Sequence, residues 1–114
     1  MVNSSFLAYI KDTLEPLGSF NYKGMFGGYG IYQGGVIFAL IIGNELYFKA
    51  DNEAEQFYGK YDSSPFTYQG KNGLVKMNYY RLPSEVLEDE DLLRNWFDVA
   101  WLVAKNAKMK KVKA

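Results

Sequence analysis

The sequence predicts an α+β protein with a two-layer fold: one antiparallel sheet with flanking helices, in the order helix, three or four strands, helix, two strands, helix. The strongest evidence is Val36–Ile42, the longest apolar run, which lies between glycine turns at Gly34-Gly35 and Gly43-Asn44. A mostly β-branched and aromatic run between such turns is typical of a strand buried on both faces. Consecutive strand-like segments also exclude the alternating strand–helix pattern of a doubly wound sheet.

The first helix is expected at about residues 4–15. Ser4 or Ser5 can cap its start, and apolar side chains then recur at helical spacing. Pro16 disfavours helical geometry at the residue before it, and Gly18 ends the segment. Such a one-faced helix needs a sheet on which to lie.

The next part of the chain is predicted to form a meander. A strand at residues 20–26 precedes a glycine-rich bend at residues 27–30, and strands at residues 30–33 and 46–50 flank the central apolar run. We expect the bend glycines to adopt φ values that other residues resist. A short polar helix follows at residues 52–58.

The second sheet segment is predicted to be a hairpin. Strands at residues 66–69 and 74–80 flank a four-residue loop at residues 70–73, which begins and ends with glycine. Pro65 breaks the preceding helix, and Ser84 can cap a turn of helix after the hairpin.

The last helix has an apolar arc that is wider than one sheet needs for its cover. Its acidic start at residues 85–91 and its lysine-rich end suit the helix dipole, and the tail at residues 106–114 is expected to fray. Either this helix is sandwiched within its own domain or it meets a second molecule. The residues expected at such an interface are Trp96, Val99, Trp101 and Val103.

Length and composition bound the function. The 114 residues are expected to form one domain, and thirteen basic and thirteen acidic side chains cancel, so no global field attracts nucleic acid or an anionic membrane. Without cysteine or histidine, the chain has no disulfide, no thiolate metal site and none of the commonest general bases. The start does not resemble a signal peptide and no apolar run approaches ~18 residues, so we expect a cytoplasmic protein.

Several local patterns have a functional and a plain structural interpretation. Gly28-x-Gly30-x-x-x-Gly34 is similar to a phosphate-binding loop, but strands follow it instead of a helix, which favours tight turns. The acidic run at residues 85–91 lacks the interleaved glycines of a metal loop and suits a solvated helix start. No nucleophile–base motif occurs, so we expect no catalytic residue, no metal and no cofactor.

Basic and aromatic residues leave nucleic-acid binding open. Tyrosines of the sheet can stack on bases or form ordinary sheet surface. Lys49, between Phe48 and Ala50, is expected near the core in an ion pair at a strand end. The lysines that either contact phosphates or form a solvated helix end are Lys105, Lys108, Lys110 and Lys111.

A series of short stretches stands in a characteristic order: MFGGYGIY at residues 25–32, LYFKAD at 46–51, PFTY at 65–68 and MNYYRLP at 77–83. Together they resemble the N-terminal domain of the TfoX/Sxy family, over roughly residues 5–105. The residues that carry the resemblance are Met25, Phe26, Gly27, Gly28, Gly30, Tyr32, Lys49, Asp51, Tyr80, Pro83 and Trp96. The sequence departs from the family in two respects: Lys23-Gly24 stand where arginines are frequent, and Tyr80 replaces the usual tryptophan.

The resemblance implies a fold similar to the type III secretion chaperones, a class in which dimers are common. Full-length members of the family regulate competence genes, are thought to act with the cyclic-AMP receptor protein at promoters, and carry a second, C-terminal domain. Residues 1–114 are then expected to be a single domain of this kind without the C-terminal one.

The expected function is therefore a non-enzymatic regulatory or adaptor domain that acts through contact with another protein or with a second copy of itself. One alternative is a nucleic-acid-binding accessory domain that uses the lysine-rich tail and the sheet tyrosines. The other is a small ligand-binding protein or enzyme with a pocket under residues 27–30.

Overall fold

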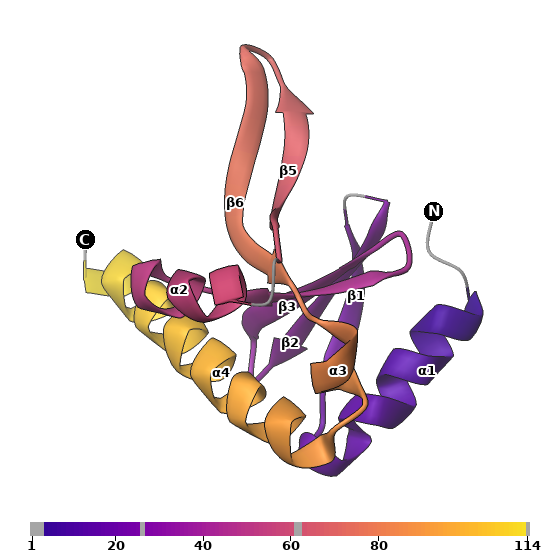
Figure 1. Cartoon of the computed structure of the whole chain (residues 1–114). Helices are drawn as coiled ribbons and strands as arrows, with labels where there is room; N and C mark the ends of the chain where they lie inside the picture. Colours follow the sequence, from indigo (N-terminus) through magenta and orange to yellow (C-terminus); the bar gives the residue numbers. More distant parts are fainter. Residues whose placement is uncertain (1–3, 26, 61–62, 114) are drawn as a thin grey trace.

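The computed structural model describes residues 4–25, 27–60 and 63–113. One sheet carries helices on one side, and a hairpin rises from it away from the helices (Figure 1). The helices are α1 (Ser4–Leu14), the 3-10 turn η1 (Glu15–Leu17), α2 (Asn52–Lys60), α3 (Ser84–Leu87) and α4 (Glu90–Lys113). The strands are β1 (Asn21–Met25), β2 (Gly28–Gln33), β3 (Val36–Ile42), β4 (Glu45–Lys49), β5 (Pro65–Gly70) and β6 (Gly73–Arg81).

The six strands have the order β1-β2-β3-β4-β6-β5, and all neighbouring pairs are antiparallel. β1 to β4 form the predicted meander, with β3 between β2 and β4. The bend predicted at residues 27–30 is wrong beyond Gly27, because β2 begins at Gly28 and pairs with β1 from that residue onward. The chain then passes through α2 and β5 before β6 pairs with β4, which places Phe48 opposite Tyr80 and Lys49 opposite Tyr79. The predicted α+β fold, an antiparallel sheet with flanking helices, is confirmed, and β5 lies at the outer edge of the sheet.

Glycine permits the tight turns on either side of β3. Gly34 and Gly35 have φ of 57° and 80°, and Gly43 has φ of 60°, in the left-handed region that residues with a side chain rarely adopt. β3 itself spans the predicted range Val36–Ile42.

The turn of the second hairpin is shorter than predicted. Gly70 pairs with Gly73, so the expected four-residue loop is wrong and Lys71-Asn72 form a two-residue turn. Gly73 has φ of 117°, and this freedom lets the chain enter β6 directly after the turn.

An irregularity in β3 places two successive side chains on the same face of the sheet. The register with β2 shifts between Ile31, opposite Ala39, and Tyr32, opposite Ile37, so Phe38 is an extra residue. Phe38 and Ala39 consequently pack into the same core, whereas Ile37 and Leu40 belong to a cluster on the other face. Burial of this strand from both faces is thus confirmed.

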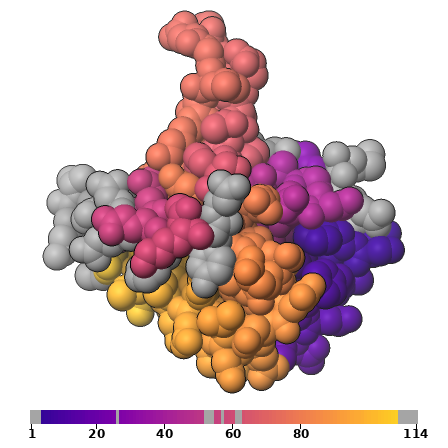
Figure 2. Space-filling view, in the orientation of Figure 1, coloured from indigo at the N-terminus to yellow at the C-terminus, as the bar shows by residue number. Residues whose placement is uncertain are grey.

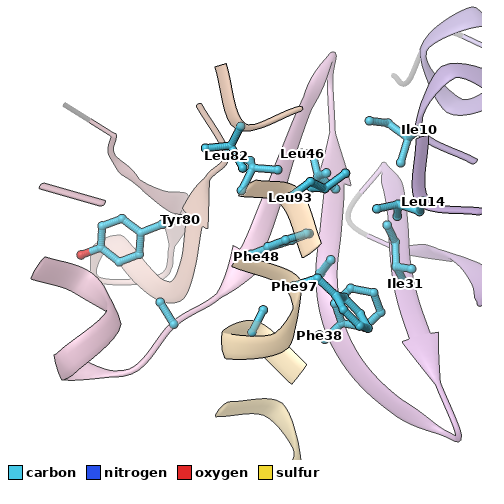
Figure 3. Close-up of a cluster of buried hydrophobic side chains, with 14 of the residues drawn as sticks. Ile10, Leu14, Ile31, Phe38, Leu46, Phe48, Tyr80, Leu82, Leu93 and Phe97 are labelled. Carbon is cyan, nitrogen blue, oxygen red and sulfur yellow. The ribbon is translucent and has the colours of Figure 1, made fainter. Parts of the chain in front are cut away.

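The main core lies between the sheet and the helices, and one of its largest fully buried side chains is that of Phe38 (Figure 3). Its ring centroid lies 5.1 Å from that of Phe97 on α4 and 5.9 Å from that of Phe48 on β4, both edge to face. Ile10 and Leu14 extend the core under α1, and both are fully buried. Apolar side chains from strands and helices therefore hold the two layers together.

Candidate protein-binding surfaces

The two faces of the sheet have different cover. The main core combines strand residues with residues of α1, α2, α3 and α4. A second cluster on the opposite face, which we call the open face, consists of strand residues alone: Met25, Ile37, Leu40, Ile42, Tyr47, Phe66, Met77 and Tyr79. Among the described residues, no helix contributes to this cluster.

Strand alternation produces the open face. In β4, Leu46 and Phe48 enter the main core while Tyr47 between them belongs to the open face. In β6, Tyr80 enters the core and Tyr79 belongs to the open face. The period of two therefore gives one sheet two apolar faces, and helices cover one of them.

Strand side chains pack against one another on the open face. Leu40 is 1% exposed and Tyr79 4% exposed, and the rings of Tyr47 and Phe66 meet edge to face with centroids 5.5 Å apart. The other members, such as Ile37, are half-buried. A half-buried apolar surface of this kind is suited to contact with a partner.

Burial on the open face also affects ionisation. Burial, with a smaller contribution from Tyr32, raises the pKa of Tyr79 to about 12. Burial and the Glu45 carboxylate raise the pKa of Tyr47, and the Arg81 guanidinium opposes them.

The raised pKa of Tyr79 predicts a loss of stability in alkali. An unfolded tyrosine ionises near pH 10, whereas folded Tyr79 stays neutral to about pH 12. The contribution of neutral Tyr79 to the free energy of unfolding is fully present below pH 10. It is lost as the pH rises from 10 through 12, because the tyrosine of the unfolded state loses its proton first. Urea titrations should show that the free energy of unfolding of Tyr79→Phe declines less steeply with pH than that of the wild type across this window. Parallel declines would contradict the prediction.

Two lysines lie over tyrosine rings at this face. The Lys23 ammonium is 5.1 Å from the ring centroid of Tyr32, and the Lys49 ammonium is 5.1 Å from that of Tyr79. Lys49 is half-buried at the end of β4, and its expected ion pair near the core stays a prediction. A partner that carries carboxylates beside its apolar side chains would suit these cations.

The distal part of the β5–β6 hairpin, residues 67–76, forms an arm that stands clear of the body (Figure 2). It exposes Tyr68 (41%), Leu74 (75%) and Val75 (37%). At its base, Lys76 on β6 forms an ion pair with Glu55 on α2, with 3.0 Å between Nζ and Oε1. Because the Lys76 side chain is exposed to solvent, this pair contributes little to stability.

The predicted interface residues of α4 lie in different surroundings. Trp96 is half-buried with its ring centroid 4.9 Å from that of Tyr58, and Trp101 is half-buried with its centroid 6.3 Å from that of Phe38. Val103 is half-buried, whereas Val99 is 45% exposed. Leu102, which is not among the predicted interface residues, is 56% exposed. Its spacing of three residues from Val99 is the signal that would have found it.

Comparison with known proteins decides the family. Residues 12–104 match the TfoX N-terminal domain. The chain belongs to this family. It is 32% identical over 85 residues to Protein Sxy of Escherichia coli (strain K12), covering 75% of this chain and 38% of that protein. It is 27% identical over 67 residues to DNA transformation protein TfoX1 of Aliivibrio fischeri (strain ATCC 700601 / ES114), covering 59% of this chain and 32% of that protein. The chain thus spans about a third of the length of these relatives.

The glycines of this TfoX N-terminal domain serve two purposes. Gly27 has φ of 74°, as expected for a conformational glycine. The same expectation is wrong for Gly28 and Gly30, which do not have positive φ. A Cβ on Gly28 would overlap the carbonyl oxygen of Ile41, and one on Gly30 would lie 2.5 Å from Sδ of Met25. Close packing explains these two glycines.

The other family-motif residues of the TfoX domain are distributed over both faces. Met25 and Tyr32 lie at the open face, Tyr80 is in the main core, and Pro83 is buried immediately before α3. Asp51 is exposed, and its backbone carbonyl accepts a hydrogen bond from the amide of Glu55 in α2. Phe26 lies outside the described residues. The motif therefore combines residues that shape the scaffold with residues that line the open face.

The lysines near the end of the TfoX domain are partly described. The Lys105 ammonium is 5.7 Å from the ring centroid of Trp101, and Lys108 Nζ donates to the carbonyl of Gly35 at 3.4 Å. The side chains of Lys110 and Lys111 lie outside the described residues, although α4 itself extends to Lys113. Phosphate contact by these lysines stays a prediction.

A hollow of about 250 Å³ lies between the β2–β3 turn and α4 of the TfoX domain, lined in part by Tyr32, Lys49 and Lys108. Among the described residues, no cluster of three or more acidic side chains is arranged to hold a metal ion. In the same part of the chain, no helix is long and apolar enough to cross a membrane.

Proposed function

We propose that this TfoX N-terminal domain is a non-enzymatic regulatory module that binds another protein in the control of DNA transformation. The family is a regulatory, competence-linked one and is not a known enzyme family. One relative is named a DNA transformation protein. The cytoplasmic location expected from the sequence stays a prediction.

The observation that carries this proposal is the open face. Its cluster is apolar, half-buried at its margin, and built from strand residues alone among those described. Lys23 and Lys49 lie over tyrosine rings at this face. We therefore expect a protein partner that presents apolar side chains flanked by carboxylates.

Ile42→Arg tests this contact. Ile42 is half-buried on the open face and pairs with Glu45, so an arginine gains a carboxylate neighbour and the fold should persist. Burial of an added cation at an interface centre should weaken partner binding at least about tenfold. The comparison variant is Leu102→Arg, at a side chain that is 56% exposed on α4, because it places the same charge on the other candidate surface and leaves the open face unchanged.

The measurement is transformation frequency in a host strain that lacks the gene and is complemented with each variant. Wild type and Leu102→Arg should restore it, and Ile42→Arg should not, while melting curves show all three folded. A protein that cross-links to the wild type and to Leu102→Arg should not cross-link to Ile42→Arg. Full complementation by Ile42→Arg would contradict the proposal.

Nucleic-acid binding is the second candidate, favoured by the Lys23–Tyr32 and Lys49–Tyr79 pairs at the open face. If all five lysines between residues 105 and 113 contacted phosphates, the affinity for DNA would fall with salt with a slope of about −4 to −5. Measuring the affinity for promoter DNA at two salt concentrations tests this second function. An affinity that does not depend on salt would contradict it.

A further inference from the structure

The two edges of the sheet are protected to different degrees. An edge strand presents unpaired backbone N–H and C=O groups, and natural proteins guard such edges with charge, proline or a bulge. β1 has Lys23 at its centre, whereas β5 contains no charged residue. Pro65 and a register shift before Thr67 lie at the body end of β5. Its outer part, residues 67–70, is therefore regular and unguarded.

The arm that presents this edge carries an excess of exposed apolar surface. Of the six large apolar side chains exposed in the described part of the chain, three lie on the arm: Tyr68, Leu74 and Val75. Beyond the Lys76–Glu55 ion pair at its base, the arm stands clear of the body (Figure 2). A two-stranded hairpin alone is marginally stable in water, so an additional strand would stabilise the arm.

The turn determines which groups of β5 point outward. Gly70 and Gly73 close a two-residue turn and so form a hydrogen-bonded pair. Because such pairs alternate in an antiparallel ladder, Tyr68 bonds to β6. The backbone groups of Thr67 and Gln69 then point away from β6, toward the free edge.

We propose that β5 pairs with β5 of a second copy of this chain, antiparallel about a two-fold axis at Tyr68. Thr67 of each copy lies opposite Gln69 of the other, which gives about four backbone hydrogen bonds between the copies. The two six-stranded sheets become continuous. This contact uses a strand edge and is independent of the open face, so it does not rest on the function proposed above.

The chemistry of the edge favours a second copy as occupant. A two-fold contact places a surface against itself, so a charged strand would place like charges together, and β5 has none. The chain has a formal net charge of zero, so two copies do not repel each other. Because the paired segment is short, the dimer belongs at the weak end of specific interfaces, with a dissociation constant in the micromolar range.

The absence of native cysteine allows a clean cross-linking test. At the two-fold axis, residue 68 of each copy forms a non-hydrogen-bonded pair with Cα atoms about 4.5 Å apart, within disulfide reach. Tyr68→Cys should form a covalent dimer under mild oxidation. The matched control is Tyr9→Cys on α1, at a tyrosine of similar exposure (44%). Equal dimer yields, or a monomeric Tyr68→Cys protein, would overturn the proposal.

Sedimentation of the cysteine-free protein gives the second test. The double variant Thr67→Glu, Gln69→Glu places carboxylates opposite each other in both pairs and should weaken dimerisation at least tenfold. Its fold should persist because residue 67 faces Lys76 on β6. Asn21→Glu, at an exposed position of β1, should leave dimerisation unchanged, as should Ile42→Arg.

Three outcomes would contradict the proposed dimer. The first is a monomeric wild type at several hundred micromolar. The second is an unchanged dissociation constant in the double variant. The third is loss of the dimer with Asn21→Glu or Ile42→Arg, which would place the contact at β1 or on the open face.

Discussion

Phe38→Ala is expected to lower the free energy of unfolding by about 3–5 kcal/mol. The Phe38 side chain is fully buried, and its ring centroid lies 5.3 Å from that of Phe20 and 5.1 Å from that of Phe97. Phe97 lies on α4 and Phe20 lies in the segment between η1 and β1, so these neighbours cannot close together over the space that a methyl group leaves. The loss is a large share of the roughly 5–15 kcal/mol that stabilises a domain.

Thermal and urea unfolding measure this loss. For a chain of this size, about 4 °C of melting temperature corresponds to each kcal/mol, so the midpoint should fall by at least about 12 °C. Val99→Ala, at a side chain that is 45% exposed on α4, should change stability by less than about 0.5 kcal/mol. A Phe38→Ala midpoint close to that of this control would show that the ring is not central to the core.

Gly28→Val is expected to destabilise the protein by about 3 kcal/mol, at the upper end of the usual cost of overpacking. The first side-chain atom would overlap the carbonyl oxygen of Ile41, and a backbone atom cannot turn aside as a flexible side chain can. Tyr29 pairs with Ile41 in the same ladder, so relief requires β2 to separate locally from β3.

The control for this substitution lies on the neighbouring strand. Gly24 is exposed on β1, and a Cβ there would meet only the Gly28 carbonyl oxygen, at 3.9 Å. Gly24→Val should therefore stay within about 0.5 kcal/mol of the wild type. If urea unfolding gives both variants the same stability, close packing does not explain Gly28.

Local pattern was sufficient for the meander. The range of β3 follows from an apolar run between glycines, and each neighbouring turn is formed by residues adjacent in sequence. The local sequence pattern could not predict why position 28 requires a glycine. Its constraint comes from Ile41, thirteen residues further along the chain, and a glycine required for space is indistinguishable in sequence from one required for φ.

The candidate surfaces depend on long-range pairing, which the sequence pattern does not contain. The predicted hairpin is present, but it joins the rest of the sheet by pairing β6 with β4. The other strand of the hairpin, β5, therefore lies at the edge. Tyr79 and Tyr80 are neighbours of the same type in sequence, yet one lies on the open face and the other in the main core. The pairing of Phe48 with Tyr80 determines which of the two tyrosines lies in the main core and which lies on the open face.

The attachment of the second hairpin also has a consequence for how this fold can vary in length. β6 contacts β4 through Tyr79, Tyr80 and Arg81, at the opposite end of the strand from Lys71-Asn72. Residues added or removed in matched pairs near that tip would change its reach without shifting any side chain beneath the helices. The length of the arm can therefore vary while the main core stays unchanged.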